Sequence, residues 1–96
     1  MATDSAIRSV SNTLTTTVAD TITLTQGWPA IEVTNSDTTN ILWVRQDGTT
    51  AVALADNATP IAPGTSKIIS SSPNSSGQHV ISVVGSGGAY TIEGVQ

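Results

Sequence analysis

The side chains that could carry chemistry in this sequence are few and far apart. His79 is the single histidine and cysteine is absent, so the ligands that most often bind zinc together are missing. Nucleophilic catalysis of the serine type needs a serine, a histidine and a carboxylate that converge, and no nucleophile-elbow motif is present. His79 opens an Ile/Val-rich stretch and is predicted to be a surface residue at a strand end.

The seven acidic residues are scattered and do not suggest a catalytic carboxylate pair. Asp20, Asp37, Asp47 and Asp56 lie in predicted turns, where Asp is common because its side chain bonds nearby backbone groups. No loop alternates Asp and Asn as a calcium site would. Gly85–Gly88 lacks the following helix and the lysine of a phosphate-binding loop. The sequence therefore predicts no enzymatic activity, no metal and no cofactor.

Three aromatic residues, Trp28, Trp43 and Tyr90, are the remaining candidates for a binding surface. They would suit a sugar-stacking platform of the kind found in β-sandwich carbohydrate-binding modules. Packing in a core or a subunit interface is the favoured interpretation for Trp43 and Tyr90. Trp28 precedes Pro29 in a predicted turn and is expected to be the most exposed of the three.

Charge excludes two classes of partner. The 96 residues carry a net charge of −4, and the basic residues Arg8, Arg45 and Lys67 are widely separated. No basic stripe can follow a phosphate backbone, and no polybasic segment can bind a membrane surface. Neither a signal peptide nor a run of about 18 apolar residues is recognisable. We therefore expect no nucleic acid and no membrane partner.

The longest run of large apolar side chains is Ile41–Val44, which is predicted to be a central strand. Alternate side chains of a strand point to opposite faces, so Leu42 and Val44 share one face while Ile41 and Trp43 share the other. Both faces are therefore apolar, although a small sandwich ordinarily leaves one face of each sheet polar. We expect this strand to be covered twice, and the chain to be a homo-oligomer.

Period-two alternation indicates further strands along most of the chain, over 14–18, 21–25, 31–34, 67–71, 79–84 and 89–95. Asp47-Gly48 is predicted to end the central strand in a tight hairpin turn, with 49–57 as its return strand or an irregular edge. Gly85–Gly88 is predicted to join the last two strands in a hairpin. No capped helix is present. The fold class is therefore all-β, an antiparallel β-sandwich or small barrel of about seven or eight short strands.

Residues 1–12 lack sustained alternation and are predicted to be a flexible N-terminal arm before a single β-sandwich domain at 13–96. Ile7 and Val10 lie three residues apart, with the positive charge of Arg8 between them. Two hypotheses remain open. The segment is an idle tail, or it becomes ordered on a partner, with Ile7 and Val10 buried and Arg8 beside a carboxylate.

The order of these features has a parallel. A strand ending at Asn35 precedes the Asp47-Gly48 turn, then the Pro63-Gly64 turn, then the glycine-rich segment at 85–88. This order resembles small virion proteins of tailed bacteriophages of the capsid decoration, or cementing, type. The stretches that carry the resemblance are Thr21–Leu24, Ile31–Asn35, Ile41–Gly48, Ile61–Ser66 and Val80–Ile92.

The resemblance implies a β-sandwich or barrel, made in the bacterial host cytoplasm, that binds the major capsid protein in the virion as a homo-oligomer, with a trimer as the expected order. It transfers no catalytic residues. Two alternatives remain open: a carbohydrate-binding module on the virion that uses Trp28 and Tyr90, or a structural protein of the tail or neck. The candidate residues for a capsid or subunit interface are Ile7, Arg8, Val10, Trp28, Ile41 and Trp43.

Overall fold

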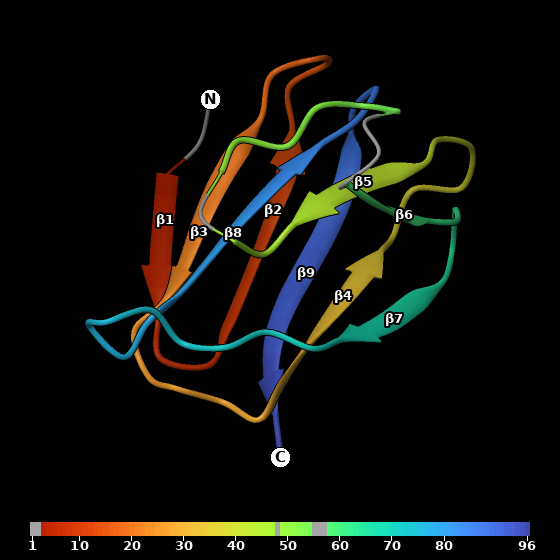
Figure 1. Ribbon diagram of the computed structural model, residues 1–96. Coiled ribbons are helices and arrows are strands. Elements are labelled where there is room, and N and C mark those ends of the chain that lie inside the picture. Colours follow the sequence, from red (N-terminus) through yellow and green to blue (C-terminus); the bar gives the residue numbers. More distant parts are fainter. Residues whose placement is uncertain (1–2, 48, 55–57) are drawn as a thin grey trace.

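The protein is a sandwich of two β-sheets. A computed structural model describes residues 3–47, 49–54 and 58–96, and in this part of the chain it contains strands and no helix. Sheet A has the strand order β1-β3-β8-β5-β6, and sheet B has the order β2-β9-β4-β7 (Figure 1). The strands are β1 (Thr3–Ala6), β2 (Ser9–Leu14), β3 (Asp20–Leu24), β4 (Ala30–Asn35), β5 (Leu42–Arg45), β6 (Thr59–Ile61), β7 (Ser66–Ile69), β8 (His79–Val84) and β9 (Gly88–Val95).

This arrangement confirms the predicted all-β sandwich class. The pairing is antiparallel throughout the described strands except between β1 and β3, which run parallel. Alternation also places the apolar side chains as expected, with Ile22 and Leu24 of β3 fully buried between the sheets and Thr21 and Thr23 partly exposed.

Consecutive strands lie in opposite sheets at every described step except from β5 to β6. The predicted terminal hairpin is therefore wrong, because β8 belongs to sheet A and β9 to sheet B. The glycine-rich segment crosses from one sheet to the other instead of reversing within one. Gly87 and Gly88 make this crossing at φ values of 105° and 97°, which a side chain would oppose.

The strand that returns beside β5 is β6, with Leu42 opposite Ile61 and Val44 opposite Thr59. Residues 49–54 form no strand, so they are not the return strand. The predicted tight turn at Asp47-Gly48 includes Gly48, and the stretch predicted as return strand or irregular edge includes 55–57; Gly48 and 55–57 lie outside the described residues. The described part of this loop crosses the outer face of sheet A, where the backbone N–H of Ala51 donates to Ser82 Oγ at 2.8 Å (Figure 1).

The N-terminal segment differs from the expected flexible arm, because it is built into both sheets. β1 pairs with β3, and β2 pairs with β9 along its whole length. Val10 and Leu14 face the core, and Asn12 takes the inward position between them, opposite Tyr90. This polar residue interrupts the apolar alternation that would have marked a strand.

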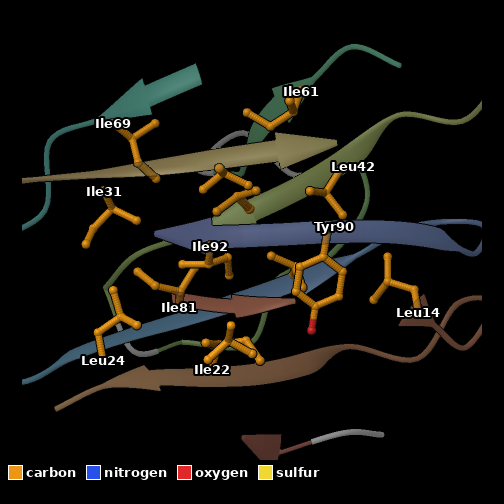
Figure 2. Close-up of a cluster of buried hydrophobic side chains, with 14 of the residues drawn as sticks. Leu14, Ile22, Leu24, Ile31, Leu42, Ile61, Ile69, Ile81, Tyr90 and Ile92 are labelled. Atoms are coloured by element: carbon orange, nitrogen blue, oxygen red, sulfur yellow. The ribbon is translucent and has the colours of Figure 1, made fainter. Parts of the chain in front are cut away.

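The core fills the space between the two sheets (Figure 2). Burial of each large aliphatic side chain in this core contributes roughly 1.5–3 kcal/mol to the free energy of unfolding, relative to leaving that side chain exposed. Trp28 closes the core at one end, and Leu14 and Tyr90 lie toward the other. The buried cluster consists of Val10, Leu14, Ile22, Leu24, Trp28, Ile31, Val33, Leu42, Val44, Ile61, Ile69, Ile81, Val83, Tyr90 and Ile92.

Candidate functional site

The titratable side chains do not converge on a reactive centre. Among the described residues, no three His, Asp or Glu side chains lie close enough together to hold a metal ion. In the same part of the chain, every buried side-chain nitrogen or oxygen has a hydrogen-bond partner. The buried polar groups are therefore engaged with the protein itself.

His79 is buried, at 1% exposure, and the prediction of a surface position was wrong. Its Nε2 accepts the backbone N–H of Trp28 at 2.8 Å, and its Nδ1 lies 3.0 Å from Ser71 Oγ. Because Nε2 is an acceptor, the ring hydrogen is on Nδ1 and points toward the serine. Burial lowers the pKa of His79 below 6.5, and the bond from Trp28 requires an unprotonated Nε2. This neutral ring ties the turn at Trp28 to the start of β8.

Trp28 is also buried, at 8% exposure, so the expectation that it is the most exposed aromatic was wrong. Its ring lies directly against Gly94, where an added Cβ would overlap the indole atoms Cδ1 and Cγ. The indole N–H donates to the carbonyl of Ile7 at 2.9 Å. The guanidinium carbon of Arg8 lies 5.5 Å from the ring centroid, within range of a cation–π contact. Trp28 thus plugs one end of the sandwich.

Ile7 and Arg8 form the corner where the chain leaves sheet A and enters sheet B. We call these two residues, whose backbone is bonded by the Trp28 indole, the Ile7 corner. Arg8 Nε donates to the Gly94 carbonyl at 3.2 Å, and the Gly94 N–H donates to the Arg8 carbonyl at 2.8 Å. Arg8 Nε also lies 4.0 Å from a carboxylate oxygen of Glu93. The Ile7 side chain, in contrast, is 64% exposed. The corner therefore presents an apolar side chain on a fixed backbone.

The other N-terminal candidate, Val10, is not at the surface. It lies opposite Ile92 and is buried between the sheets. Its predicted role in an interface was wrong for this reason.

Tyr90 belongs to the core, as the favoured interpretation expected. Its hydroxyl donates to Asp20 Oδ2 at 2.8 Å, and both side chains are about 1% exposed. Burial and the bond to Asp20 raise the pKa of Tyr90 well above its ordinary value. With Trp28 also buried, neither residue of the expected sugar-stacking pair offers a ring face to solvent.

Ile41 and Trp43 lie on the outer side of β5, while Leu42 and Val44 face the core, as predicted. Trp43 packs beside a small buried cluster of Ala19, Ala51 and Val84. Next to this cluster is a groove of about 340 Å³, which we call the Trp43 groove. Its lining consists of Thr17, Trp43, Ala51, Val52, Ala53, Val84, Gly85 and Ser86.

Sequence reasoning missed most of this lining. Thr17 and Gly85 come from distant loops that the bond from Thr17 N–H to the Gly85 carbonyl joins at 2.9 Å. The wall at 51–53 belongs to the stretch whose structure was left open. The small side chains in this stretch could have indicated that its backbone packs against a sheet. Ala51 is small enough to lie close to sheet A, whereas a larger side chain would hold the loop away from the sheet.

A second hollow, of about 260 Å³, has a more polar lining that includes Gln46 and Asp47. Arg45 bonds both carboxylate oxygens of Asp47 and, with the Thr49 N–H, lowers the pKa of Asp47 to about 2. This carboxylate is therefore already satisfied within the protein. The hollow is lined by Gln46, Asp47, Ser72, Asn74, Gln78 and Val80.

The Ile7 corner and the Trp43 groove lie at opposite ends of the sandwich (Figure 1). The corner follows β1, which ends beside Leu24, the last residue of β3. The groove includes Gly85, which follows β8 near Asp20, the first residue of β3. Two surfaces with exposed apolar side chains are thus separated by the length of the strands.

Comparisons with protein-family models, with curated proteins and with solved structures found no match to this chain. Within the described residues, no helix could cross a membrane.

Proposed function

We propose that this chain is a non-enzymatic structural protein of a tailed-bacteriophage virion, which cements the capsid by binding across the boundaries between major capsid subunits. The observation that supports this most is the Ile7 corner. A large apolar side chain stands 64% exposed on backbone that Trp28 and Gly94 hold by hydrogen bonds.

Such a corner suits docking because its backbone is ordered before binding. A flexible arm would lose roughly 1–2 kcal/mol of backbone entropy per residue on ordering, and this corner avoids most of that cost. Ile7 supplies apolar area for a pocket on the partner. Arg8 supplies a guanidinium whose side chain is 58% exposed, which we expect to meet a carboxylate of the partner.

A capsid also multiplies weak contacts. Its subunits repeat, so an oligomer that carries several docking corners engages several sites at once. Cementing needs no chemistry beyond this binding. The buried side-chain nitrogen and oxygen atoms of the described residues are all hydrogen-bonded within the protein, which agrees with a role in binding alone.

Two other roles are tested alongside. A tail or neck protein could use the same corner, and the copy number in purified particles distinguishes it. Hundreds of copies per particle agree with decoration, while a few dozen or fewer agree with a tail or neck position. A glycan-binding module is disfavoured by the burial of Trp28 and Tyr90.

The direct test is binding of the purified chain to capsids that lack it, by co-sedimentation. We expect Ile7→Asp to weaken binding by roughly tenfold or more, because it places a charge in an apolar contact. Ile68→Asp is the matched control: Ile68 is 62% exposed, on the outer side of sheet B. Equal binding by the wild type and Ile7→Asp would overturn the assignment of the corner, and no binding by the wild type would overturn the capsid proposal.

A further inference from the structure

We propose that a second copy of this chain occupies the Trp43 groove, with its Leu54 side chain inserted. This contact is independent of the capsid proposal, because it forms between copies of the isolated protein. It combines four observations: an apolar groove, an apolar side chain projecting beside it, the distribution of charge, and the protection of the strand edges.

Large exposed apolar side chains gather at this end of sheet A. Leu54 is 81% exposed, Val52 is 60% exposed and Ile41 is 45% exposed. Leu54 follows directly on Ala53 of the groove lining and has a φ of 64°, which is uncommon for a leucine. The protein thus holds a projecting side chain and a recess of about 340 Å³ on the same surface.

A projection and a recess on one surface are self-complementary. A two-fold axis between two copies places each Leu54 in the groove of the other, so that one pairing forms two equal contacts. A closed three-fold ring, the order that the resemblance implies, satisfies each projection and each groove in turn. Both arrangements use the same contact.

Charge favours this surface for contact with an identical copy. The net charge of −4 makes copies repel one another where their acidic residues meet. On the outer side of sheet B, Glu32 and Glu93 lie directly opposite one another on β4 and β9. Among the described residues, the lining of the Trp43 groove contains no charged side chain. The described part of this surface therefore brings no carboxylates together when two copies approach.

The strand edges oppose the other common mode of self-association, in which sheets join edge to edge. β6 carries Pro60, which has no N–H to donate. β7 carries Lys67 opposite the buried Val33, and β1 carries Asp4 opposite the buried Ile22, so both charges sit on the core side of an edge strand. Such residues protect edges from pairing. Three of the four edge strands, β1, β6 and β7, are therefore protected, which favours association through a face over association through these edges.

The test measures the mass of the full chain in solution by sedimentation across a wide concentration range. We expect a dimer or a closed ring, and both masses support the proposal if Leu54→Asp weakens association by roughly tenfold or more. Ile68→Asp, the control on sheet B, should associate like the wild type. Circular dichroism verifies that each variant is folded.

A mixing experiment separates insertion of Leu54 from general stickiness. Leu54→Asp removes the projection and keeps the groove, whereas Ser86→Trp fills the groove from its exposed rim and keeps the projection. Each variant alone should be mainly monomeric, and an equimolar mixture should form a mixed pair that is held by one of the two contacts and is therefore weaker than the wild-type pair. A wild type that is monomeric at all concentrations, Leu54→Asp that associates normally, or variants that do not combine would each overturn the proposal. A monomer that binds capsids through this groove would do the same, since the occupant would then be the capsid.

Discussion

The backbone N–H of Trp28 donates to Nε2 of His79 across 2.8 Å, inside the end of the sandwich that carries the Ile7 corner. Through this bond a titratable ring holds the turn on which the indole rests. The indole in turn bonds the carbonyl of Ile7, so the geometry of the corner depends on a neutral histidine.

The stability of the fold should therefore depend on pH between 6.5 and the lowered pKa of folded His79. In this window the unfolded chain binds a proton that the folded chain does not, so the free energy of unfolding rises with pH. The contribution of neutral His79 to stability is complete above pH 6.5. It is lost as the pH falls through the pKa of His79 in the folded chain. Urea unfolding at about pH 5 and about pH 7.5 measures it.

The control for this pH dependence is His79→Gln, which keeps an acceptor for the Trp28 N–H without titrating. It should be less stable at neutral pH and should lose most of the slope. The pKa of Asp47 is lowered to about 2. The pKa of Asp37 lies below 3.8, because Asn40 first and then backbone N–H groups donate to the Asp37 carboxylate. These two carboxylates therefore change stability only at lower pH. An unchanged slope in His79→Gln would refute this role.

Gly94→Ala should destabilise the fold by about 1–3 kcal/mol, because the new methyl group overlaps the Trp28 ring and the ring must move. Gly64→Asn is a suitable control. Gly64 has a φ of 69° that asparagine tolerates, and nothing lies within 4 Å of an added Cβ. Urea unfolding with unchanged m-values would measure both, and equal losses would show that Trp28 does not rest on Gly94.

Tyr90→Phe should lower the free energy of unfolding by about 1.5–3 kcal/mol, because Asp20 loses a buried hydrogen bond. The wild type offers a direct spectroscopic readout, since Tyr90 is the single tyrosine. Its pKa is raised by burial and then by Asp20, so tyrosinate absorbance should be absent near pH 11 until the chain unfolds. Absorbance at the ordinary tyrosine pKa of about 10 in the folded state would contradict the buried pair.

Two deletions should separate the roles of β1 and β2. Removal of residues 1–6 takes away a strand whose side chains are mostly exposed, and a folded protein should remain. Removal of 1–12 also takes Val10 from the core, at a cost of at least about 1.5–3 kcal/mol, and leaves β9 without a neighbour on one side. Thermal unfolding compares the two, and equal stability would mean that β2 contributes nothing.

The sequence was sufficient for the fold class because alternation reports which residues face inward. Ile22, Ile31 and Val33 all lie where their pattern predicts. Alternation does not indicate which sheet a strand joins, since the two-residue period of apolar side chains is the same whether two strands form a hairpin or lie in different sheets. The error at Gly85–Gly88 arose there, and its positive φ values suit both kinds of connection.

The sites were less predictable because they depend on contacts distant in sequence. Trp28 looked exposed because a Trp-Pro turn usually lies at a surface, and nothing local indicated that Gly94 leaves space for its ring. His79 looked exposed because it begins a strand, while its acceptor role depends on a donor 51 residues away. In contrast, the outward position of Ile41 and Trp43 followed directly from the doubly apolar strand.

The place of β9 in sheet B determines when this protein can fold during its synthesis. β9 follows the other described strands in sequence, yet it lies between β2 and β4, and β8, the strand before it, lies between β3 and β5. Neither sheet can close until these two strands have left the ribosome, because no earlier pairing substitutes for them. At roughly 5–20 residues per second, β2 waits several seconds for its partner, with Val10 and Leu14 unburied. Until Val95 emerges, the many Ser and Thr side chains must therefore keep the unpaired strands of the nascent chain hydrated and soluble.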